Sequence, residues 1–310
     1  MVHAAPTVSV VVPVLDGLIH LGAALASVRE QTLVDHEVVV VDAGSTDGSD
    51  LLVEEIARDD ERVRLVRASR RLSAPEARTL GLEHSRADVV ATLDQDDLML
   101  PDRLRLQVEA LRAEPDLLAV GGMLTKIDDD GVARAPLEDG RPTSPVMVRW
   151  ALPYFAAALS SSLVHRRDVL VSLGGFDTAH PLADDYALLV RLLRLGDVRV
   201  LPDVVGRYRR HSRQTSTLRS RRQHAETMLL RASVVAERTG RRPPPDVMRD
   251  VCVRHGGSVS RPQEAEEVCV ELYAAFHADV VPSTEEQRWI DADHSRRLAR
   301  IREADVVTTS

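Results

Sequence analysis

The segment Asp94-Gln95-Asp96-Asp97 places three carboxylates within four residues, directly after an apolar stretch. Neighbouring carboxylates repel one another, so a site that keeps them charged needs a compensating cation. Mg²⁺ and Mn²⁺ prefer oxygen ligands and fit such a cluster. A divalent ion held there could bridge a diphosphate and stabilise it as a leaving group. The alternative is a solvated turn, and the position after an apolar stretch favours the metal-binding interpretation.

Two further acidic positions have the setting of a site. Asp42 ends an apolar run and precedes a turn of small polar residues, so its carboxylate could accept hydrogen bonds from a nucleobase or a ribose. An Asx turn or a helix cap is the alternative for Asp42. The pair Asp184-Asp185 opens an apolar helical pattern. The helix dipole favours acids in the first turn and accounts for one of the two, and the other could act as a general base that deprotonates a hydroxyl group.

A basic segment follows further along the chain. Residues 207–222 contain seven arginines and no acid, with His211 among them. Arginines in this number could clamp phosphates or lie against anionic lipid. A basic surface segment without a ligand is the alternative.

A second acidic cluster, Asp128-Asp129-Asp130-Gly131, has a different setting from the first. It lies between two stretches with strand patterns that could pair as a hairpin. Acids followed by glycine are typical of tight turns. We therefore interpret this cluster as a solvated turn.

The stretches that must position these residues alternate between strand and helix patterns over the first hundred residues. The patterns predict strands at 8–14, 37–41, 62–67 and 87–93, and helices at 18–31, 46–58, 73–85 and 101–113. Ser73 and Glu76 have the spacing of a capping box, and Ser45 or Thr46 is expected to cap the helix before it. Repeated strand–helix units predict a parallel sheet with helices on both faces. Ligands bind at the carboxyl ends of such strands, which places on one edge of the sheet Pro13-Val14-Leu15-Asp16, residues 42–45 and residues 94–97.

The remaining two thirds of the chain have a less regular pattern. It predicts strands at 117–127, 132–135, 157–165, 198–201 and 204–209, and helices at 143–150, 166–173 and 183–195. From residue 217 the pattern is helical almost to the end, with breaks at 240–245 and 256–262. Trp150, Tyr154 and Phe155 could present aromatic faces to a sugar acceptor, and core packing is the alternative for this trio.

Composition limits the class of protein. Hydrophobic residues make up 44% and charged residues 28% of the 310, which is typical of a globular chain. The net charge of −8 argues against a protein that coats nucleic acid. No Gly-x-Gly-x-x-Gly follows a strand and no Walker lysine is present, which disfavours dinucleotide and P-loop sites. Without a signal-peptide pattern or a long apolar run, and with Cys252 and Cys269 expected as free thiols, the sequence predicts a cytoplasmic protein. Peripheral contact with the inner face of a membrane is left open.

A series of segments, taken in order, resembles the motifs of the family-2 glycosyltransferases with the GT-A fold. The segments are residues 8–13 followed by Asp16, residues 41–49, 77–81 and 93–97, Gly174-Gly175-Phe176-Asp177, residues 184–188, and Tyr208-Arg209-Arg210-His211. The resemblance implies an α/β fold with a Rossmann-like, mostly parallel central sheet and flanking helices over residues 1–216. Its nucleotide-binding half would span about 1–126 and its acceptor half about 127–216, and residues 217–310 would form a helical C-terminal extension.

The resemblance also implies roles for individual residues. Asp185 matches the catalytic base of inverting members, and Asp96 and His211 match positions that hold the metal. The donor nucleotide sugar would be bound by Pro13, Val14, Leu15, Asp16, Asp42, Arg78, Asp94, Gln95, Gly174 and Gly175. The sequence departs from the usual pattern at Leu15, where an aromatic residue is common, at Thr79, where asparagine is common, and at Asp184, where glutamate is usual.

Together these features predict a metal-dependent inverting glycosyltransferase. It would use Mn²⁺ or Mg²⁺ and move one sugar from a nucleotide-diphosphate sugar to an acceptor hydroxyl. The resemblance implies that this donor is a UDP-sugar. The acceptor could be a glycan, a lipid-linked sugar or a small molecule, and residues 217–310 could form a homodimer surface. One alternative is a non-catalytic subunit that binds nucleotide sugars. A sugar-phosphate nucleotidyltransferase is disfavoured, because no glycine-rich basic loop follows the first strand.

Overall fold

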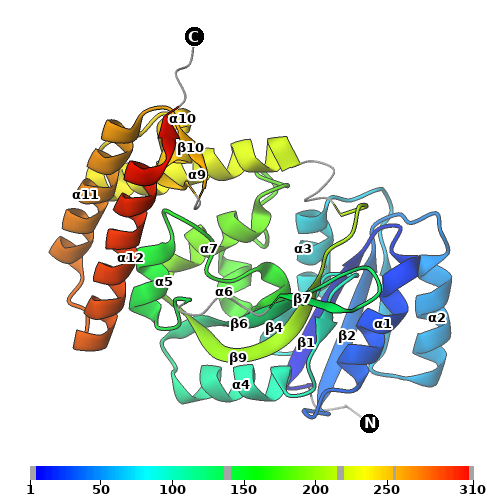
Figure 1. Ribbon diagram of the computed structural model, residues 1–310. Coiled ribbons are helices and arrows are strands. Elements are labelled where there is room, and N and C mark those ends of the chain that lie inside the picture. The colour runs from blue at the N-terminus through cyan, green and yellow to red at the C-terminus, as the bar shows by residue number, and fades with distance from the viewer. Residues whose placement is uncertain (1–4, 136–140, 215–219, 254–255, 307–310) are drawn as a thin grey trace. The chain divides into compact units, whose positions relative to one another are not determined.

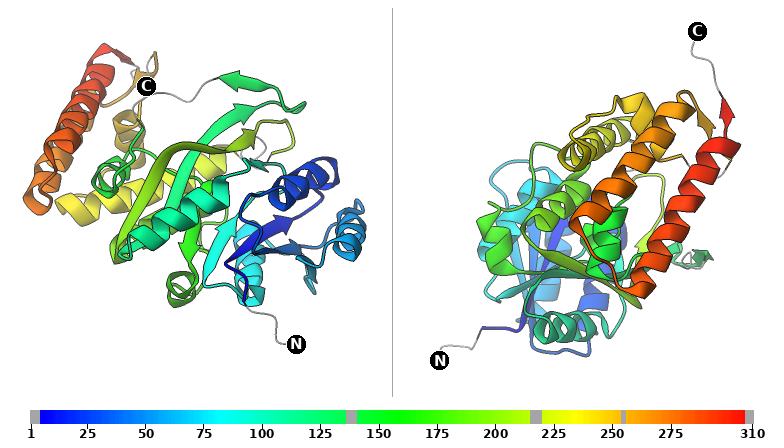
Figure 2. Two further views of the ribbon diagram at one scale, coloured as in Figure 1. Left: turned by 90° about the horizontal axis from the view of Figure 1, so that it is seen from below. Right: turned by 90° about the vertical axis from the view of Figure 1, so that its left-hand side faces the viewer.

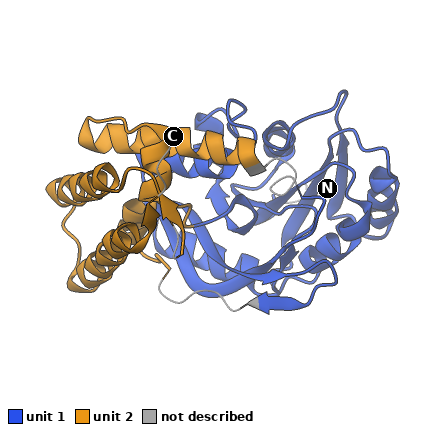
Figure 3. Ribbon diagram, turned by 45° about the horizontal axis from the view of Figure 1, so that its top comes forward, with its two compact units in different colours: residues 1–139, 158–218 blue, residues 140–157, 219–310 orange. Residues whose placement is uncertain are grey.

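The computed structural model describes residues 5–135, 141–214, 220–253 and 256–306 (Figure 1). The chain forms two compact units, one of residues 1–139 with 158–218 and one of residues 140–157 with 219–310 (Figure 3). Residues 140–157 thus group with the C-terminal residues. The domain boundaries expected from the sequence stay a prediction.

The first unit begins with a parallel half-sheet. Its strands lie in the order β3-β2-β1-β4. Their bounds are Val8–Val14 (β1), His36–Asp42 (β2), Val63–Arg67 (β3) and Val89–Thr92 (β4). Every residue of β1 and β2 is buried, as strands covered on both faces require. The predicted parallel strand–helix half is therefore present.

Helices cover both faces of this half-sheet. They are Leu18–Arg29 (α1), Ser49–Asp59 (α2) and Ala74–His84 (α3). The helix Arg103–Ala113 (α4) packs instead mainly on the strand at Leu117–Ile127. Alternate valines of β1 and β2 pack with Leu21 and Leu25 of α1. The valines that point the other way, Val39 and Val41, pack with Ala77 of α3. This alternation follows from the two-residue period of a strand.

The second half of the sheet is mixed. Beyond β4 the order continues β8-β6-β9-β5, and β7 pairs with β6. Their bounds are Leu98–Met99 (β5), Leu117–Ile127 (β6), Ala133–Ala135 (β7), Val164–Arg166 (β8) and Asp197–Arg209 (β9). Strand β9 is long and curved (Figure 2) and runs parallel to β6. The helices Arg167–Ser172 (α6) and Asp184–Leu195 (α7) complete the unit.

Several predicted elements were wrong in detail. Residues 157–165 do not form one strand, because Ser160–Ser162 form a 3₁₀ helix (η1) before the short strand β8. The two strands predicted at 198–201 and 204–209 are one strand with irregular pairing near Pro202, which lacks an amide hydrogen. Helix α2 begins only after Gly48, whose φ is +91°, and neither Ser45 nor Thr46 caps it.

The second unit is helical. It contains Pro145–Ala151 (α5), Ser220–Thr239 (α9), Pro245–Val251 (α10), Pro262–Asp279 (α11) and Thr284–Glu303 (α12), with a short strand pair of Ser258–Val259 (β10) and Asp305–Val306 (β11). Helices α11 and α12 run side by side (Figure 1). In the part of the chain that the structure describes, no helix is both long and apolar enough to cross a membrane.

Trp150, Tyr154 and Phe155 form part of the hydrophobic core of this unit. Trp150 and Tyr154 are buried, and Phe155 packs against the same cluster. The Trp150 indole donates a hydrogen bond to Asp293 at 2.8 Å, and the Arg297 guanidinium lies 3.8 Å from the centre of the Tyr154 ring. Of the two alternatives for Trp150 and Tyr154, the structure supports core packing, because both rings are enclosed by neighbouring helices.

Candidate active site

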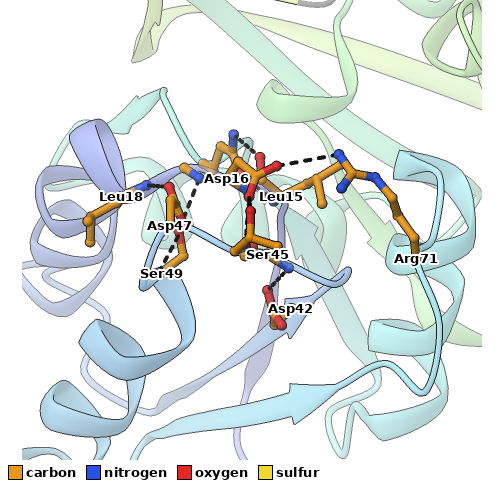
Figure 4. A network of polar contacts seen from close by, with 11 residues as sticks. Leu15, Asp16, Leu18, Asp42, Ser45, Asp47, Ser49 and Arg71 are labelled. Carbon is orange, nitrogen blue, oxygen red and sulfur yellow. Dashed lines mark hydrogen bonds and ion pairs between the residues drawn. The ribbon is translucent and has the colours of Figure 1, made fainter.

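The loops after β1 and β2 are tied together at the carboxyl edge of the sheet (Figure 4). Asp16 has a φ of +51°, the one positive value among the described residues other than glycine. Its carboxylate accepts a hydrogen bond from the Thr46 amide at 2.8 Å, and its own amide donates to the Ser45 hydroxyl at 3.0 Å. The buried Asp42 carboxylate accepts from the Ser45 amide at 3.1 Å. The backbone strain at Asp16 is therefore held by the loop that follows Asp42.

Gln95 ties the loop after β4 to the same place. Its Oε1 accepts a hydrogen bond from the Leu15 amide at 2.8 Å, and its Nε2 donates to the Leu15 carbonyl at 3.2 Å. A β-carbon on Gly17 would lie 2.5 Å from Gln95 Oε1, so a larger residue there would displace the Gln95 amide from Leu15. The amide of Gln95 is thus used to hold Leu15, and a direct role of Gln95 in donor binding stays a prediction.

Arg78 is a buried cation between two carboxylates. One terminal nitrogen donates to Asp94 at 2.6 Å, and the other donates to Asp184. A capping box of Ser73 and Glu76 starts its helix as predicted. Burial by itself lowers the pKa of Arg78, but the carboxylates around it raise that pKa above the ordinary value. Arg78 therefore stays charged and joins the end of β4 to the start of α7.

Asp184 and Asp185 begin α7, and their surroundings disfavour ionisation. Burial raises the pKa of Asp184 to about 7. Burial also raises the pKa of Asp185, and Asp94 adds to the effect. Asp185 is only partly enclosed, so it combines a raised pKa with access to solvent. A carboxylate of this kind is suited to accept a proton near neutral pH.

Asp96 and His211 face each other although 115 residues separate them in the chain. The Asp96 carboxylate lies 2.8 Å from His211 Nε2. Burial raises the pKa of Asp96, with a further contribution from Asp94. No group of three or more histidine, cysteine or acidic side chains poised for a metal occurs among the described residues. The Asp96 carboxylate fits an ion whose other ligands are water and phosphate oxygens, as is common for Mg²⁺ at phosphate sites, and His211 could add an imidazole nitrogen.

Asp97 has a structural setting, unlike its neighbour Asp96. It is 2% exposed and accepts a hydrogen bond from the Arg209 amide at 2.9 Å. Burial raises the pKa of Asp97 well above its ordinary range. Beneath it, the fully buried Arg103 donates to the carbonyls of Ser161 at 2.5 Å and Thr92 at 2.9 Å. Sequence reasoning missed Arg103, although its four-residue spacing from Gln107 within an apolar helical face was a usable signal.

The glycine pair sits against α3. Gly174 and Gly175 have φ values of +74° and +86°, which glycine adopts without strain. A β-carbon on Gly175 would lie 2.6 Å from the Thr79 hydroxyl, which accepts a hydrogen bond from the Phe176 amide at 3.0 Å. Thr79, one of the departures from the family pattern, therefore fixes this turn.

The raised pKa of Asp184 makes a prediction about stability. Between about pH 4 and pH 7 the folded protein holds a proton at Asp184 that the unfolded chain releases. The contribution of Asp184 to the free energy of unfolding is therefore full below pH 4 and falls as the pH rises to 7, by at most about 1.4 kcal/mol per pH unit. We expect Asp184→Asn to remove this slope.

Denaturant unfolding of the parent and of Asp184→Asn at a series of pH values measures the effect. The stability of the variant relative to the parent should improve as the pH rises to about 7 and then level off. Asp203→Asn changes an exposed acid of the same unit and serves as the control. A constant difference between parent and Asp184→Asn over this range would contradict the pKa assignment.

Residues 9–166 match the model of the family described as "Glycosyl transferase family 2". The chain belongs to this family. It is thus a glycosyltransferase that acts on nucleotide sugars, and the predicted family, enzyme class and GT-A fold are confirmed.

Named relatives agree with this assignment. The amylovoran biosynthesis glycosyltransferase AmsE of Erwinia amylovora is 27% identical over 226 residues, which cover 71% of this chain and 82% of AmsE. A structure of Staphylococcus aureus TarS 1-349 in complex with UDP is similar with a TM-score of 0.60 at 18% identity, covering 96% of this chain and 90% of that one. This chain spans 55% of a longer TarS structure. The mannosyltransferase PcManGT of Pyrobaculum calidifontis, solved with GDP-Man and Mn²⁺, gives 0.61 at 23% identity, covering 96% and 86%.

Proposed function

We propose that this family-2 member is a metal-dependent inverting enzyme that transfers one sugar from a UDP-sugar to an acceptor hydroxyl. One observation carries the proposal: Asp94, linked through Arg78 to the start of α7, stands beside the Asp96–His211 pair at the edge where the β1 and β2 loops meet. Donor, ion and base sites would therefore adjoin. The other predicted donor residues, Pro13 to Asp16, Asp42, Gly174 and Gly175, are assigned to the donor on the family resemblance.

The ion would be held by Asp96 and His211 together with the diphosphate. When bound, Mn²⁺ or Mg²⁺ would neutralise charge on the departing diphosphate. The two side chains already lie within 2.8 Å of each other. Because protein ligands alone are few, the ion is expected to bind well only when the nucleotide is present.

Asp185 would do the acid–base work. Its carboxylate takes the proton of the acceptor hydroxyl as that oxygen attacks the anomeric carbon from the side opposite the leaving group. The bond from the anomeric carbon to the diphosphate breaks with its electron pair on the diphosphate, so the configuration inverts. The partial exposure and raised pKa of Asp185 support this role.

Structural neighbours contain two different nucleobases. A TarS structure contains UDP-GlcNAc, whereas the PcManGT structure contains GDP-Man. We propose uracil for this chain on the pattern of the family. The acceptor would be met by residues 127–216, and the helical residues 217–310 would form an acceptor-side wall or a dimer surface.

A donor screen tests the proposal. UDP-, GDP- and dTDP-sugars with and without Mn²⁺ are compared by thermal shift, and slow release of nucleotide diphosphate is followed for the donors that bind. We expect a UDP-sugar to bind with Mn²⁺ and to release UDP. Binding without any release would favour the non-catalytic subunit, and no metal-dependent binding of any donor would refute the proposal.

A further inference from the structure

The turn Asp128–Gly131 lies between β6 and β7, as expected, but its backbone is not left to solvent. Its carbonyls of Asp128 and Asp129 accept hydrogen bonds from Arg209 Nη1 at 3.0 and 2.7 Å. Arg209 is 5% exposed, and its guanidinium donates to backbone carbonyls. An arginine that is buried against carbonyls of a turn holds the backbone of that turn in place.

The same arginine also holds the Asp96–Asp97 segment at two points. Its Nε donates to the Asp96 carbonyl at 3.0 Å, and its backbone amide donates to the neighbouring Asp97 carboxylate at 2.9 Å. His211, two residues after Arg209 in the chain, forms a hydrogen bond with the Asp96 carboxylate. Arg209 therefore ties the backbone of Asp96 and the side chain of Asp97 to the strand end that leads to His211.

A histidine that was not predicted from the sequence, His20, also contacts the Asp128–Gly131 turn. His20 in α1 pairs with the Asp129 carboxylate at 3.0 Å. Its ring centre lies 5.1 Å from that of His211, at an interplanar angle of 55°. The turn is therefore also linked indirectly to His211, through Asp129 and His20.

We propose that Arg209 is a positioning residue, which locks the Asp128–Gly131 turn to the Asp96 loop and so holds Asp96 and His211 ready for the ion and diphosphate. The proposal rests on the proposed function, because it concerns the same site. The Nε and Nη1 atoms of one guanidinium reach these three carbonyls together, and the compact ammonium of lysine lacks this fork.

The test compares Arg209→Lys with Arg207→Lys, an exposed arginine on the same strand. Calorimetry measures UDP affinity with and without Mn²⁺, and hydrogen exchange follows residues 126–134. Groups that orient metal ligands commonly contribute 10- to 100-fold in metal affinity. We expect Arg209→Lys to weaken the Mn²⁺-dependent UDP affinity at least about tenfold, to leave the metal-free affinity near that of the parent, and to speed exchange in the turn. Arg207→Lys should match the parent.

Asp129→Asn provides a milder variant, since the Asp129 side chain is 65% exposed and its loss spares the core. It should weaken the Mn²⁺-dependent UDP affinity by a smaller factor. Faster exchange in the turn with an unchanged Mn²⁺ effect in both variants would overturn the proposal. If Mn²⁺ does not change the UDP affinity of the parent, the proposed function fails. If hydrogen exchange in the turn is unchanged in Arg209→Lys, only the positioning role of Arg209 is refuted.

Discussion

Asp185→Asn should lower the rate at which UDP is formed from the UDP-sugar about a thousandfold, while UDP itself still binds. General base catalysis contributes about 10²- to 10⁴-fold, and an asparagine amide of nearly the same shape cannot accept the proton. Burial and the Asp94 charge already disfavour the ionised form of Asp185. Removing its charge should therefore not weaken the folded state. Initial rates with the donor found in the screen, together with calorimetry of UDP and Mn²⁺, measure both effects.

Asp203→Asn is the matched control for this variant. It makes the same chemical change at an exposed acid of β9 and should keep the parent rate. An Asp185→Asn protein that turned over at the parent rate would show that another group takes the proton. Loss of UDP binding together with the rate would place Asp185 in donor binding instead.

Arg78→Gln is expected to have the largest effect on stability. The change leaves Asp184 and Asp94 without the buried cation that both contact. Breaking a buried ion pair by removing one partner typically costs about 3–5 kcal/mol. Denaturant unfolding without nucleotide measures the loss. Arg70→Gln, which removes an exposed arginine paired with Glu76, should have little effect.

A second substitution separates charge from packing at Arg78. Above pH 7, where Asp184 ionises, Arg78→Gln with Asp184→Asn lacks one of the uncompensated carboxylates, so part of the lost stability should return. Such recovery is the coupling that contacting residues show in a double-mutant cycle. If Arg78→Gln were as stable as Arg70→Gln, Arg78 would not be the compensating cation of this cluster.

Elements defined by local patterns could be predicted from the sequence. The valine runs of β1 and β2 matched buried strands, and the capping box of Ser73 and Glu76 starts α3. The hairpin of β6 and β7 also lies where the pattern placed it. These features depend on residues close together in the chain, so the sequence alone contains their cause.

Elements that depend on distant partners could not be predicted. The Ser160–Ser162 segment is 3₁₀ because its carbonyls bond to side chains of other elements: the Thr92 hydroxyl, Arg103 and Gln107. Helix α2 starts late because the turn before it supplies Thr46 and Ser45 to Asp16. No local pattern encodes either set of bonds.

The candidate site divides in the same way. Its acids could be located from the sequence because each follows a strand or opens a helix. The roles of the surrounding cations could not be predicted in this way. Arg103 and Arg209 bind backbone carbonyls of segments that lie elsewhere in the chain. His20 meets the site only because α1 and the Asp128–Gly131 turn approach each other.

Calorimetric titration of UDP into the parent and into Asp96→Asn, each with and without Mn²⁺, tests the central claim most directly. Metal-dependent donor binding predicts that Mn²⁺ tightens UDP binding about tenfold or more in the parent and has no effect in Asp96→Asn. Without Mn²⁺ the variant should bind UDP at least as well as the parent, because a carboxylate facing the diphosphate is gone. Equal UDP affinity of the parent with and without Mn²⁺, or an undiminished Mn²⁺ effect in Asp96→Asn, would contradict the account.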